Sequence, residues 1–298
     1  RGADLSFFVK FWGIRGSIPT PGHSTRKYGG NTSCVELRIG DSLFICDAGT
    51  GLRELGIDLI ERENEPIKGH FFFSHTHWDH IQGFPFFGPV YDPKNTFVIY
   101  GEPGGDNHVH KLLSGQMRPE YFPVDFKELS ATVQEGSLQV GENEIAGVRV
   151  NSHQQPHPGG SCAFSFEFQG AKVVYATDSE LDATLLNPEE VAANPQALRR
   201  LPQSIVDFVA DADLLIGDAQ YTDAEYPSHA GWGHARASTT VDLAIQARVR
   251  QLALFHHDPM QSDRDVDRKV NDCRDRAAIL RPELVIFGAR EGLELKVL

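Results

Sequence analysis

The segment Ser74–His80, with the sequence SHTHWDH, constrains this chain more than any other stretch. It follows an apolar run of three phenylalanines, which predicts a short buried strand. His75 and His77 are two residues apart, so in an extended segment their side chains point to the same side. Asp79 and His80 come after a turn and can reach a second point nearby. Imidazoles and a carboxylate suit Zn²⁺ or a similar divalent ion, so the segment predicts two metal ions held close together.

A single histidine beside an apolar strand is usually a packed or solvent-facing residue. Three histidines and an aspartate at this spacing are different, because burying such a cluster without a metal would be costly. The metal-binding interpretation is therefore the one we carry forward.

Length and composition set outer limits on the fold. The chain has 298 residues, of which 40% are hydrophobic, so it can bury a large core in one or two domains. It contains no internal repeat and no low-complexity linker, which predicts a single domain over residues 1–298. No run of 18 or more apolar residues is present, so we expect no membrane partner. The sequence starts at Arg1 without a signal-peptide core, and the native chain can extend before it.

Charge and cysteine content point to the compartment and the partners. The four cysteines, Cys34, Cys46, Cys162 and Cys273, form no C-x-x-C pair, so we expect free thiols in a reducing cytoplasm. The net charge is −13, and an acidic protein repels polyanions. The charge disfavours a large nucleic acid as substrate and leaves open a small phosphodiester that metal ions hold directly. A homodimer stays open.

Other polar residues with metal-binding capacity stand where predicted strands end. An apolar strand, Lys172–Ala176, delivers Asp178, whose carboxylate can bridge two cations. His157 precedes the strand Cys162–Phe168, and Leu252–Phe255 ends in His256 and His257. Repetition of this strand-then-ligand pattern predicts that the strands end at one common rim.

The helices and loops that we predict frame this rim. Helices are expected from Leu52 to about Arg62, from an N-cap at Ser238 to about Ala247, and over Asp263–Leu280. The segment Gln116–Pro123 is expected to lie over the mouth of the site, and the glycine-flanked loop before His234 to be flexible.

These motifs resemble the metallo-β-lactamase superfamily, whose signature is the H-x-H-x-D-H spacing at His75–His80. The resemblance covers nearly the whole chain. It is strongest to the phosphodiesterase branch, which includes tRNase Z, and to a subgroup that shares the loops at Phe11–Pro19 and Tyr28–Cys34. Members of that subgroup are similar to cyclic-nucleotide and phosphonate-pathway phosphodiesterases. The implied fold is α/β, a four-layer αββα sandwich.

The resemblance also implies a ligand set. The branch has a histidine six residues before a Gly-Tyr pair, and here His157 stands six before Ala163-Phe164. The implied ions are two divalent metals, with Zn²⁺ favoured and Mn²⁺ as the alternative. His153 and His257 remain alternatives to His157 and His256. The implied set is His75, His77 and His157 on one ion, Asp79, His80 and His256 on the other, and Asp178 on both.

A second pair of segments implies an acid for the leaving group. Enzymes like tRNase Z carry a glutamate after an apolar strand and a later histidine, and here Asp218 and His234 occupy those places. The implied roles are that Asp218 orients His234 and that His234 protonates the departing oxygen. The shorter aspartate is a departure from the family pattern.

The implied reaction is hydrolysis in which a hydroxide shared by two ions attacks phosphorus, with Asp79 also orienting it. We therefore expect a dinuclear phosphodiesterase acting on a small phosphodiester such as a cyclic nucleotide. The alternatives are a lactonase or thioesterase of the same fold and a non-catalytic metal-binding sensor. A zinc β-lactamase is disfavoured because such enzymes have a cysteine where this chain has Asp178, and a diiron protein because His77 stands where that branch has glutamate.

Overall fold

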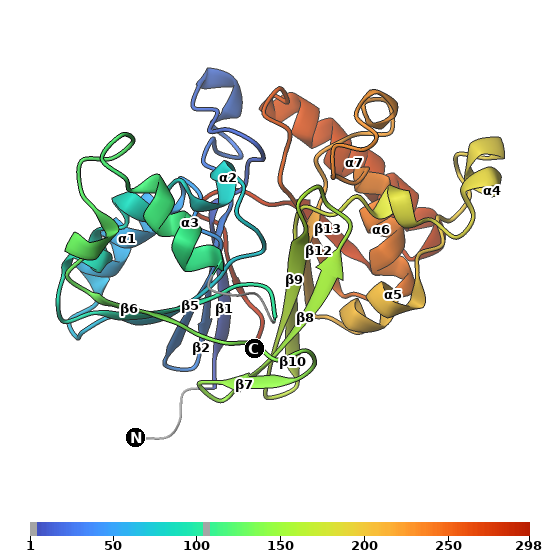
Figure 1. Ribbon diagram of the computed structural model, residues 1–298. Helices are drawn as coiled ribbons and strands as arrows, with labels where there is room; N and C mark the ends of the chain where they lie inside the picture. Colours follow the sequence, from blue (N-terminus) through green and yellow to red (C-terminus); the bar gives the residue numbers. More distant parts are fainter. Residues whose placement is uncertain (1–4, 104–107) are drawn as a thin grey trace.

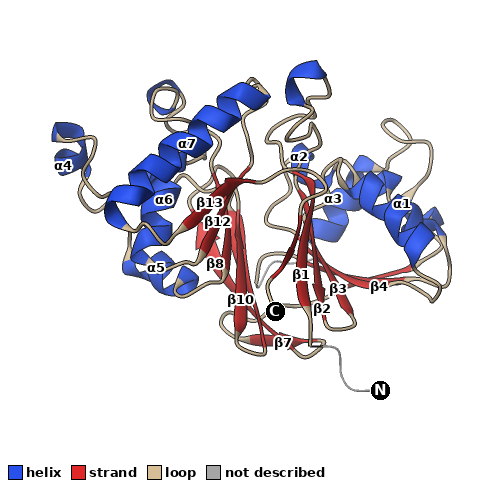
Figure 2. Ribbon diagram, turned by 180° about the vertical axis from the view of Figure 1, so that it is seen from behind, coloured by secondary structure: helices blue, strands red, loops and turns tan. Residues whose placement is uncertain are grey.

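Two β-sheets stand face to face between two layers of helices in the computed structural model, which describes residues 5–103 and 108–298 (Figure 1). The first sheet has the order β14-β1-β2-β3-β4-β5-β6, and the second the order β13-β12-β11-β10-β9-β8-β7. Helices α1 and α3 cover the outer face of the first sheet, and α5, α6 and α7 cover that of the second (Figure 2). The predicted αββα sandwich is confirmed.

The strands of the first sheet are β1 (Phe7–Gly13), β2 (Cys34–Ile39), β3 (Ser42–Cys46), β4 (Lys68–Phe72), β5 (Thr96–Tyr100), β6 (Thr132–Glu135) and β14 (Glu294–Lys296). Those of the second are β7 (Asn143–Ile145), β8 (Val148–Gln155), β9 (Ser161–Phe168), β10 (Ala171–Ala176), β11 (Leu214–Asp218), β12 (Gln251–Phe255) and β13 (Val285–Gly288). The helices are α1 (Leu52–Arg62), α2 (Trp78–Ile81), α3 (His108–Gln116), α4 (Pro188–Ala193), α5 (Gln203–Val209), α6 (Ala237–Gln246) and α7 (Asp263–Leu280).

The phenylalanines before the motif show how the layers are filled. Phe72 packs in the core between the two sheets, whereas Phe71 and Phe73 pack in the core beneath the helices of the first sheet. Successive side chains of a strand point to opposite faces, so a strand buried on both faces is apolar at every position. The end of β4, which lies between β3 and β5, is buried on both faces, so the motif that follows it has a rigid base.

The directions of the strands place the site. β3 and β4 are parallel neighbours, as are β10, β11 and β12. β8 is antiparallel to β9, which is antiparallel to β10, so β8 runs in the same direction as β10. Because parallel strands end at the same edge of a sheet, their carboxyl ends bring the predicted site residues to one rim.

Two of the three predicted helices have the predicted bounds, and the third begins earlier than predicted. α1 and α7 have the predicted bounds, and Ser262 caps α7 in a capping box with Asp265. The predicted N-cap of α6 is wrong, because the helix starts at Ala237 and the Ser238 hydroxyl instead donates to Asp223. No helix in the described part of the chain is long and apolar enough to cross a membrane.

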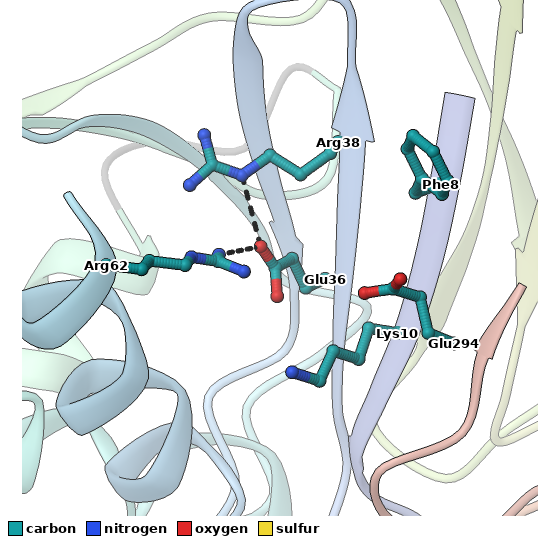
Figure 3. A pocket seen from close by; sticks show the side chains of 6 residues that line it. All are labelled: Phe8, Lys10, Glu36, Arg38, Arg62 and Glu294. Atoms are coloured by element: carbon teal, nitrogen blue, oxygen red, sulfur yellow. Dashed lines mark hydrogen bonds and ion pairs between the residues drawn. The ribbon is translucent and has the colours of Figure 1, made fainter. Parts of the chain in front are cut away.

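A charged cluster lies on the first sheet, where the side chains of Arg38 and Arg62 point toward Glu36 (Figure 3). Its centre is the buried Glu36, which accepts hydrogen bonds from Arg38, Arg62 and, at 2.8 Å, from the indole of Trp12. Lys10 lines the same cavity of about 210 Å³. The cluster joins the end of α1 to β2 by opposite charges.

Candidate metal centre

All seven predicted metal ligands meet at the rim. One group contains His75, His77, His157 and Asp178, and another contains Asp79, His80 and His256, with the ligand atoms of each group within 4.8 Å of one another. Their assignment as ligands stays a prediction. What the structure adds is the position of each ligand atom.

The first group has the spacing of a four-ligand site. His77 Nδ1 lies 2.9 Å from His75 Nε2 and 3.1 Å from His157 Nε2. Asp178 Oδ2 lies 3.6 Å from His75 Nε2 and 3.7 Å from His157 Nε2. Ligands at about 2.0–2.1 Å from a tetrahedral zinc ion lie about 3.3 Å from one another. The donor atoms therefore fit one such ion.

The second group uses the other oxygen of Asp178. Its Oδ1 lies 3.2 Å from His80 Nε2 and 3.3 Å from His256 Nε2. Asp79 Oδ2 lies 3.2 Å from each of the same two nitrogens, which are 3.3 Å apart. Since one oxygen of Asp178 faces each group, this carboxylate is placed to bridge two ions.

The ring nitrogens on the far side of the histidines have acceptors. Nδ1 of His80 lies 2.7 Å from Asp47 Oδ2, Nδ1 of His256 lies 2.8 Å from Gln220 Oε1, and Nδ1 of His157 lies 2.8 Å from the carbonyl of Gly233. A proton on each Nδ1 leaves the Nε2 lone pair free for a cation. These outer contacts favour the tautomer that a metal ligand needs.

Asp47 is one of the residues at this site that the sequence analysis missed. It is fully buried and accepts hydrogen bonds from the Ser74 backbone and hydroxyl, at 2.8 and 2.7 Å, and from the Tyr175 hydroxyl, at 2.6 Å. It thus ties the motif of the first sheet to β10 of the second. A signal was present, since Asp47 ends a buried strand just as Asp178 does.

Several site residues have left-handed backbone conformations. Ser17, Asp47, Asp178 and His256 have φ angles of 66°, 59°, 53° and 59°. Such values are uncommon outside glycine, and they persist where the surrounding structure enforces them. Gly16 shows the crowding, because a Cβ there would lie 2.4 Å from the His256 ring. These backbone conformations in the turns after the strands direct the side chains toward the site at the rim.

Burial and neighbouring charges set the protonation of the cluster. Burial and the adjoining imidazoles lower the pKa of His75 well below its ordinary value, so its ring is neutral. Burial raises the pKa of Asp79, but His80 and His256 outweigh burial and hold that pKa well below its ordinary value. Burial lowers the pKa of His80, but Asp178, Asp79 and Asp47 outweigh burial and raise it well above its ordinary value. The carboxylates draw positive charge into the cluster, which a divalent ion can supply in place of a proton.

His234 lies beside the centre and is held by Asp218. Its Nδ1 lies 2.8 Å from Asp218 Oδ2 and 3.9 Å from Asp178 Oδ2. Burial lowers the pKa of His234, but the charge and hydrogen bond of Asp218 outweigh burial and raise the pKa to about 9. The ligand atoms of Asp178, Asp218, His234 and His256 also lie within 4.8 Å of one another. His234 and Asp218 are therefore close enough to interact with a ligand bound at the centre.

The loop before His234 is fastened, contrary to our expectation of flexibility. Glu180 accepts hydrogen bonds from the backbone N–H groups of Gly231 and Gly233, at 2.6 and 2.9 Å, and from the Tyr226 hydroxyl, at 2.8 Å. Sequence analysis missed Glu180, because nothing in the local pattern around it distinguishes it from a surface glutamate.

The alternative ligands lie elsewhere. His153 is on β8 and stacks on Phe208, with ring centroids 5.2 Å apart. His257 is buried, its Nε2 lies 3.2 Å from the carbonyl of Ala289, and it belongs to none of the ligand groups. The segment Gln116–Pro123 packs beside α2, where Gln116 donates to the carbonyl of Ile81, and contributes no lining residue to the pocket over the site.

That pocket is open and has a volume of about 470 Å³. It is lined by Ser17, Thr76, His77, Trp78, Asp79, Asp178 and His234. The Ser17 N–H donates to Asp79 Oδ2 at 2.7 Å, so the loop after β1 also positions this carboxylate. No lysine or arginine is among these lining residues.

Comparison with known proteins places the site in a family. A sequence model described as "Beta-lactamase superfamily domain" matches residues 43–257. Ribonuclease Z of Brevibacillus brevis is 24% identical over 302 residues and covers 89% of each chain. Ribonuclease Z of Methanosarcina mazei is 26% identical over 305 residues, covering 89% of this chain and 92% of its own.

Solved structures share the fold. YhfI, a metallo-beta-lactamase fold protein from Bacillus subtilis, has a TM-score of 0.69 at 17% identity and covers 98% of this chain and 99% of its own. The short form of human tRNase Z has a TM-score of 0.64 at 19% identity, with 98% and 99% covered.

These relatives overturn one expectation from the sequence. We regarded a large nucleic acid as disfavoured because of the net charge, yet the similar chains are ribonucleases. The physical reason is that net charge averages over the whole surface, whereas binding depends on the local field. Divalent ions at the rim would reverse that field where a phosphate has to bind.

Proposed function

The chain belongs to the beta-lactamase superfamily and is a metal-dependent hydrolase, and from this premise we propose that it cleaves phosphodiester bonds in RNA. The observation that carries the proposal is the pair formed by His234 and Asp218 beside Asp178. An alkoxide leaving from phosphorus needs a proton, and a positioned histidine contributes typically about 10²–10⁴-fold by supplying it.

The residues of the centre fit divided roles. The proposed cofactor is two divalent ions, zinc with manganese as the alternative, and when bound they would lower the pKa of a water molecule and neutralise charge on phosphate oxygens. Asp178 would hold both ions, and Asp79, fixed by the Ser17 N–H, would orient the attacking water. His234, held by Asp218, would protonate the departing oxygen.

A small phosphodiester such as a cyclic nucleotide is the second candidate substrate. The observation in its favour is the pocket, which is about 470 Å³ in volume and has no lysine or arginine in its lining to follow a long phosphate backbone. A lactone, a thioester and a sensor role without catalysis are the remaining rivals, because all of them fit the same donor set.

A rate screen of zinc-loaded and manganese-loaded protein separates these functions. The substrates are a single-stranded ribo-oligonucleotide, cyclic mononucleotides, cyclic dinucleotides, bis-p-nitrophenyl phosphate, a lactone, a thioester and a β-lactam. We expect phosphodiesters to be hydrolysed, with the highest kcat/KM on RNA. Asp178→Asn, purified in the same way, reports any contaminating activity. Turnover confined to the lactone, thioester or β-lactam would refute phosphodiester cleavage, and two bound ions without any turnover would favour the sensor.

A further inference from the structure

Trp78 is the most exposed of the three tryptophans and lies within the H-x-H-x-D-H motif. Its side chain is 82% exposed, and it lines the pocket over the site. It stands between His77 and Asp79, one from each predicted ligand group. Consecutive Cα atoms are about 3.8 Å apart, so the indole is attached directly to the edge of the centre.

Within the described residues, the indole makes no hydrogen bond and no ring or cation–π pair. Trp12, by contrast, donates to Glu36 and lies under Lys10, whose Nζ is 4.0 Å from its ring. Trp232 packs edge-on against His229, with centroids 4.8 Å apart. A large aromatic ring that is mostly exposed in the wall of a pocket offers apolar area that a ligand can cover.

The backbone beneath this ring is firmly placed. The Gln82 N–H donates to the carbonyl of Trp78 at 2.8 Å, and the Ala48 N–H donates to that of His80 at 2.7 Å. Gly83 packs so closely on Gly49 that a Cβ there would lie 1.9 Å from the Gly49 carbonyl oxygen. The indole therefore projects from a fixed base, which lowers the cost of ordering it around a ligand.

Charge shows which kind of contact is needed. The net charge is −13, and the lining residues include no lysine or arginine that could hold a phosphate backbone. Ions held by His75, His77, His157, Asp178, Asp79, His80 and His256 would bind only the phosphate at the scissile bond and its neighbours. Additional affinity for a nucleotide has to come from its uncharged parts, and the base is the largest of these.

We propose that Trp78 is the stacking platform for a nucleobase next to the phosphate that the centre binds. The inference rests on the proposed phosphodiesterase function and specifies its substrate class as a phosphodiester that carries a base. Base–aromatic stacking tolerates every base, because each has a π-face, so the platform selects for a nucleotide without selecting its sequence.

Binding to the zinc-loaded protein tests the platform without requiring turnover. Adenosine 5′-monophosphate and ribose 5-phosphate share the phosphate and the sugar and differ in the base. We expect the first to quench tryptophan emission saturably and the second to bind about tenfold or more weakly, in keeping with the usual effect of removing a stacked base. Trp78→Phe should remove the quenching, because the emission that is left comes from Trp12 and Trp232, which the base does not cover. Trp78→Ala should remove the preference for the nucleotide, as measured by calorimetry.

Tyr121→Ala is the matched control, because Tyr121 is 77% exposed and does not line the pocket. It should keep both the quenching and the preference. Equal affinity for the two ligands, or quenching that persists in Trp78→Phe, would overturn the platform even if RNA is hydrolysed. Conversely, a nucleotide preference that depends on Trp78, in a protein that hydrolyses no phosphodiester, would refute the proposed function and support the platform.

Discussion

Glu36 and Asp79 are both buried carboxylates, at 2% and 6% exposed, but the side chains that face them differ in charge. Glu36 has the guanidinium groups of Arg38 and Arg62, so its charge is balanced by side chains of the chain itself. Asp79 has the imidazoles of His80 and His256 and, among its described partners, neither a lysine nor an arginine. A fixed opposite charge completes the first cluster, whereas the second has donor atoms arranged so that a divalent ion can supply the opposite charge.

Removal of metal should therefore break one cluster and leave the other intact. We expect dialysis against a strong chelator to abolish hydrolysis, by about a thousandfold or more, and to lower the melting temperature, because ligands that bind only the folded state stabilise it. Before treatment, elemental analysis should show two ions per chain. In crystals soaked in zinc, the two ions should lie about 3.5–4 Å apart. Recovery of activity on adding zinc or manganese completes the test, and protein that never holds more than one ion would contradict the dinuclear centre.

His234→Ala should produce the next largest effect. We expect kcat on substrates with poor leaving groups to fall roughly a hundredfold, as is usual when a general acid is lost, with metal content unchanged. A p-nitrophenolate leaving group needs little protonation, so its rate should change much less. His229→Ala, a change in the same loop outside the pocket, serves as the control. Equal losses on both kinds of substrate, or a lost ion, would show that His234 has another role.

The same variant carries a pH signature. The pKa of His234 is raised to about 9 by Asp218 despite burial, so the ring is protonated below that pH and can donate. The wild-type kcat on poor leaving groups should decline as the pH rises through this range, or through a lower one because nearby cations depress the pKa. His234→Ala should lack the alkaline decline, and a decline that remains would assign it to another group.

Glu36→Gln tests the self-contained cluster. The change keeps the shape and removes the charge, so we expect a loss of about 2 kcal/mol in the free energy of unfolding, typical of breaking a charged hydrogen-bond network. Denaturant unfolding measures this loss. Metal content and kcat should not change. Loss of an ion in this variant would mean that the two clusters are coupled and that the comparison between them fails.

Glu180→Gln should have a smaller effect that acts through His234. Glutamine has one acceptor oxygen for the donors that Glu180 now shares between two. We expect about a tenfold fall in kcat on poor leaving groups, little change in KM, and little change on p-nitrophenyl substrates. Glu189→Gln on α4, whose side chain is exposed, is the control. A uniform loss across leaving groups would indicate general destabilisation in place of a positioning role.

The features that the sequence predicted correctly depend on local patterns. The motif at His75–His80 and the bounds of α1 and α7 depend on neighbours in the sequence, and local patterns predicted them. The strand-then-ligand pattern predicted that Asp178 and His256 would meet the motif, because parallel strands end together.

Two of the missed residues, Gln220 and Glu180, depend on contacts between distant segments. Gln220 is 36 residues from His256, and Glu180 is 51 residues from Gly231. Their roles arise only when strand register is fixed, which no local pattern specifies. The ligand roles, the single domain, the homodimer and the cytoplasmic location stay predictions.

Salt dependence should give the smallest effect and also tests how an acidic chain holds RNA. A protein that neutralises phosphates with lysine or arginine loses affinity with a log–log slope of about −0.7 per contact on single strands. Because the pocket lining has no such residue, we expect a slope between zero and about −1 when log(1/KM) for an oligonucleotide is plotted against log salt concentration. KM on a mononucleotide diester, measured in parallel, corrects for effects of salt on the centre itself. A slope of about −3 or steeper for the oligonucleotide alone would show that basic residues outside the pocket bind the strand, and stacking on Trp78 would then be a minor part of the affinity.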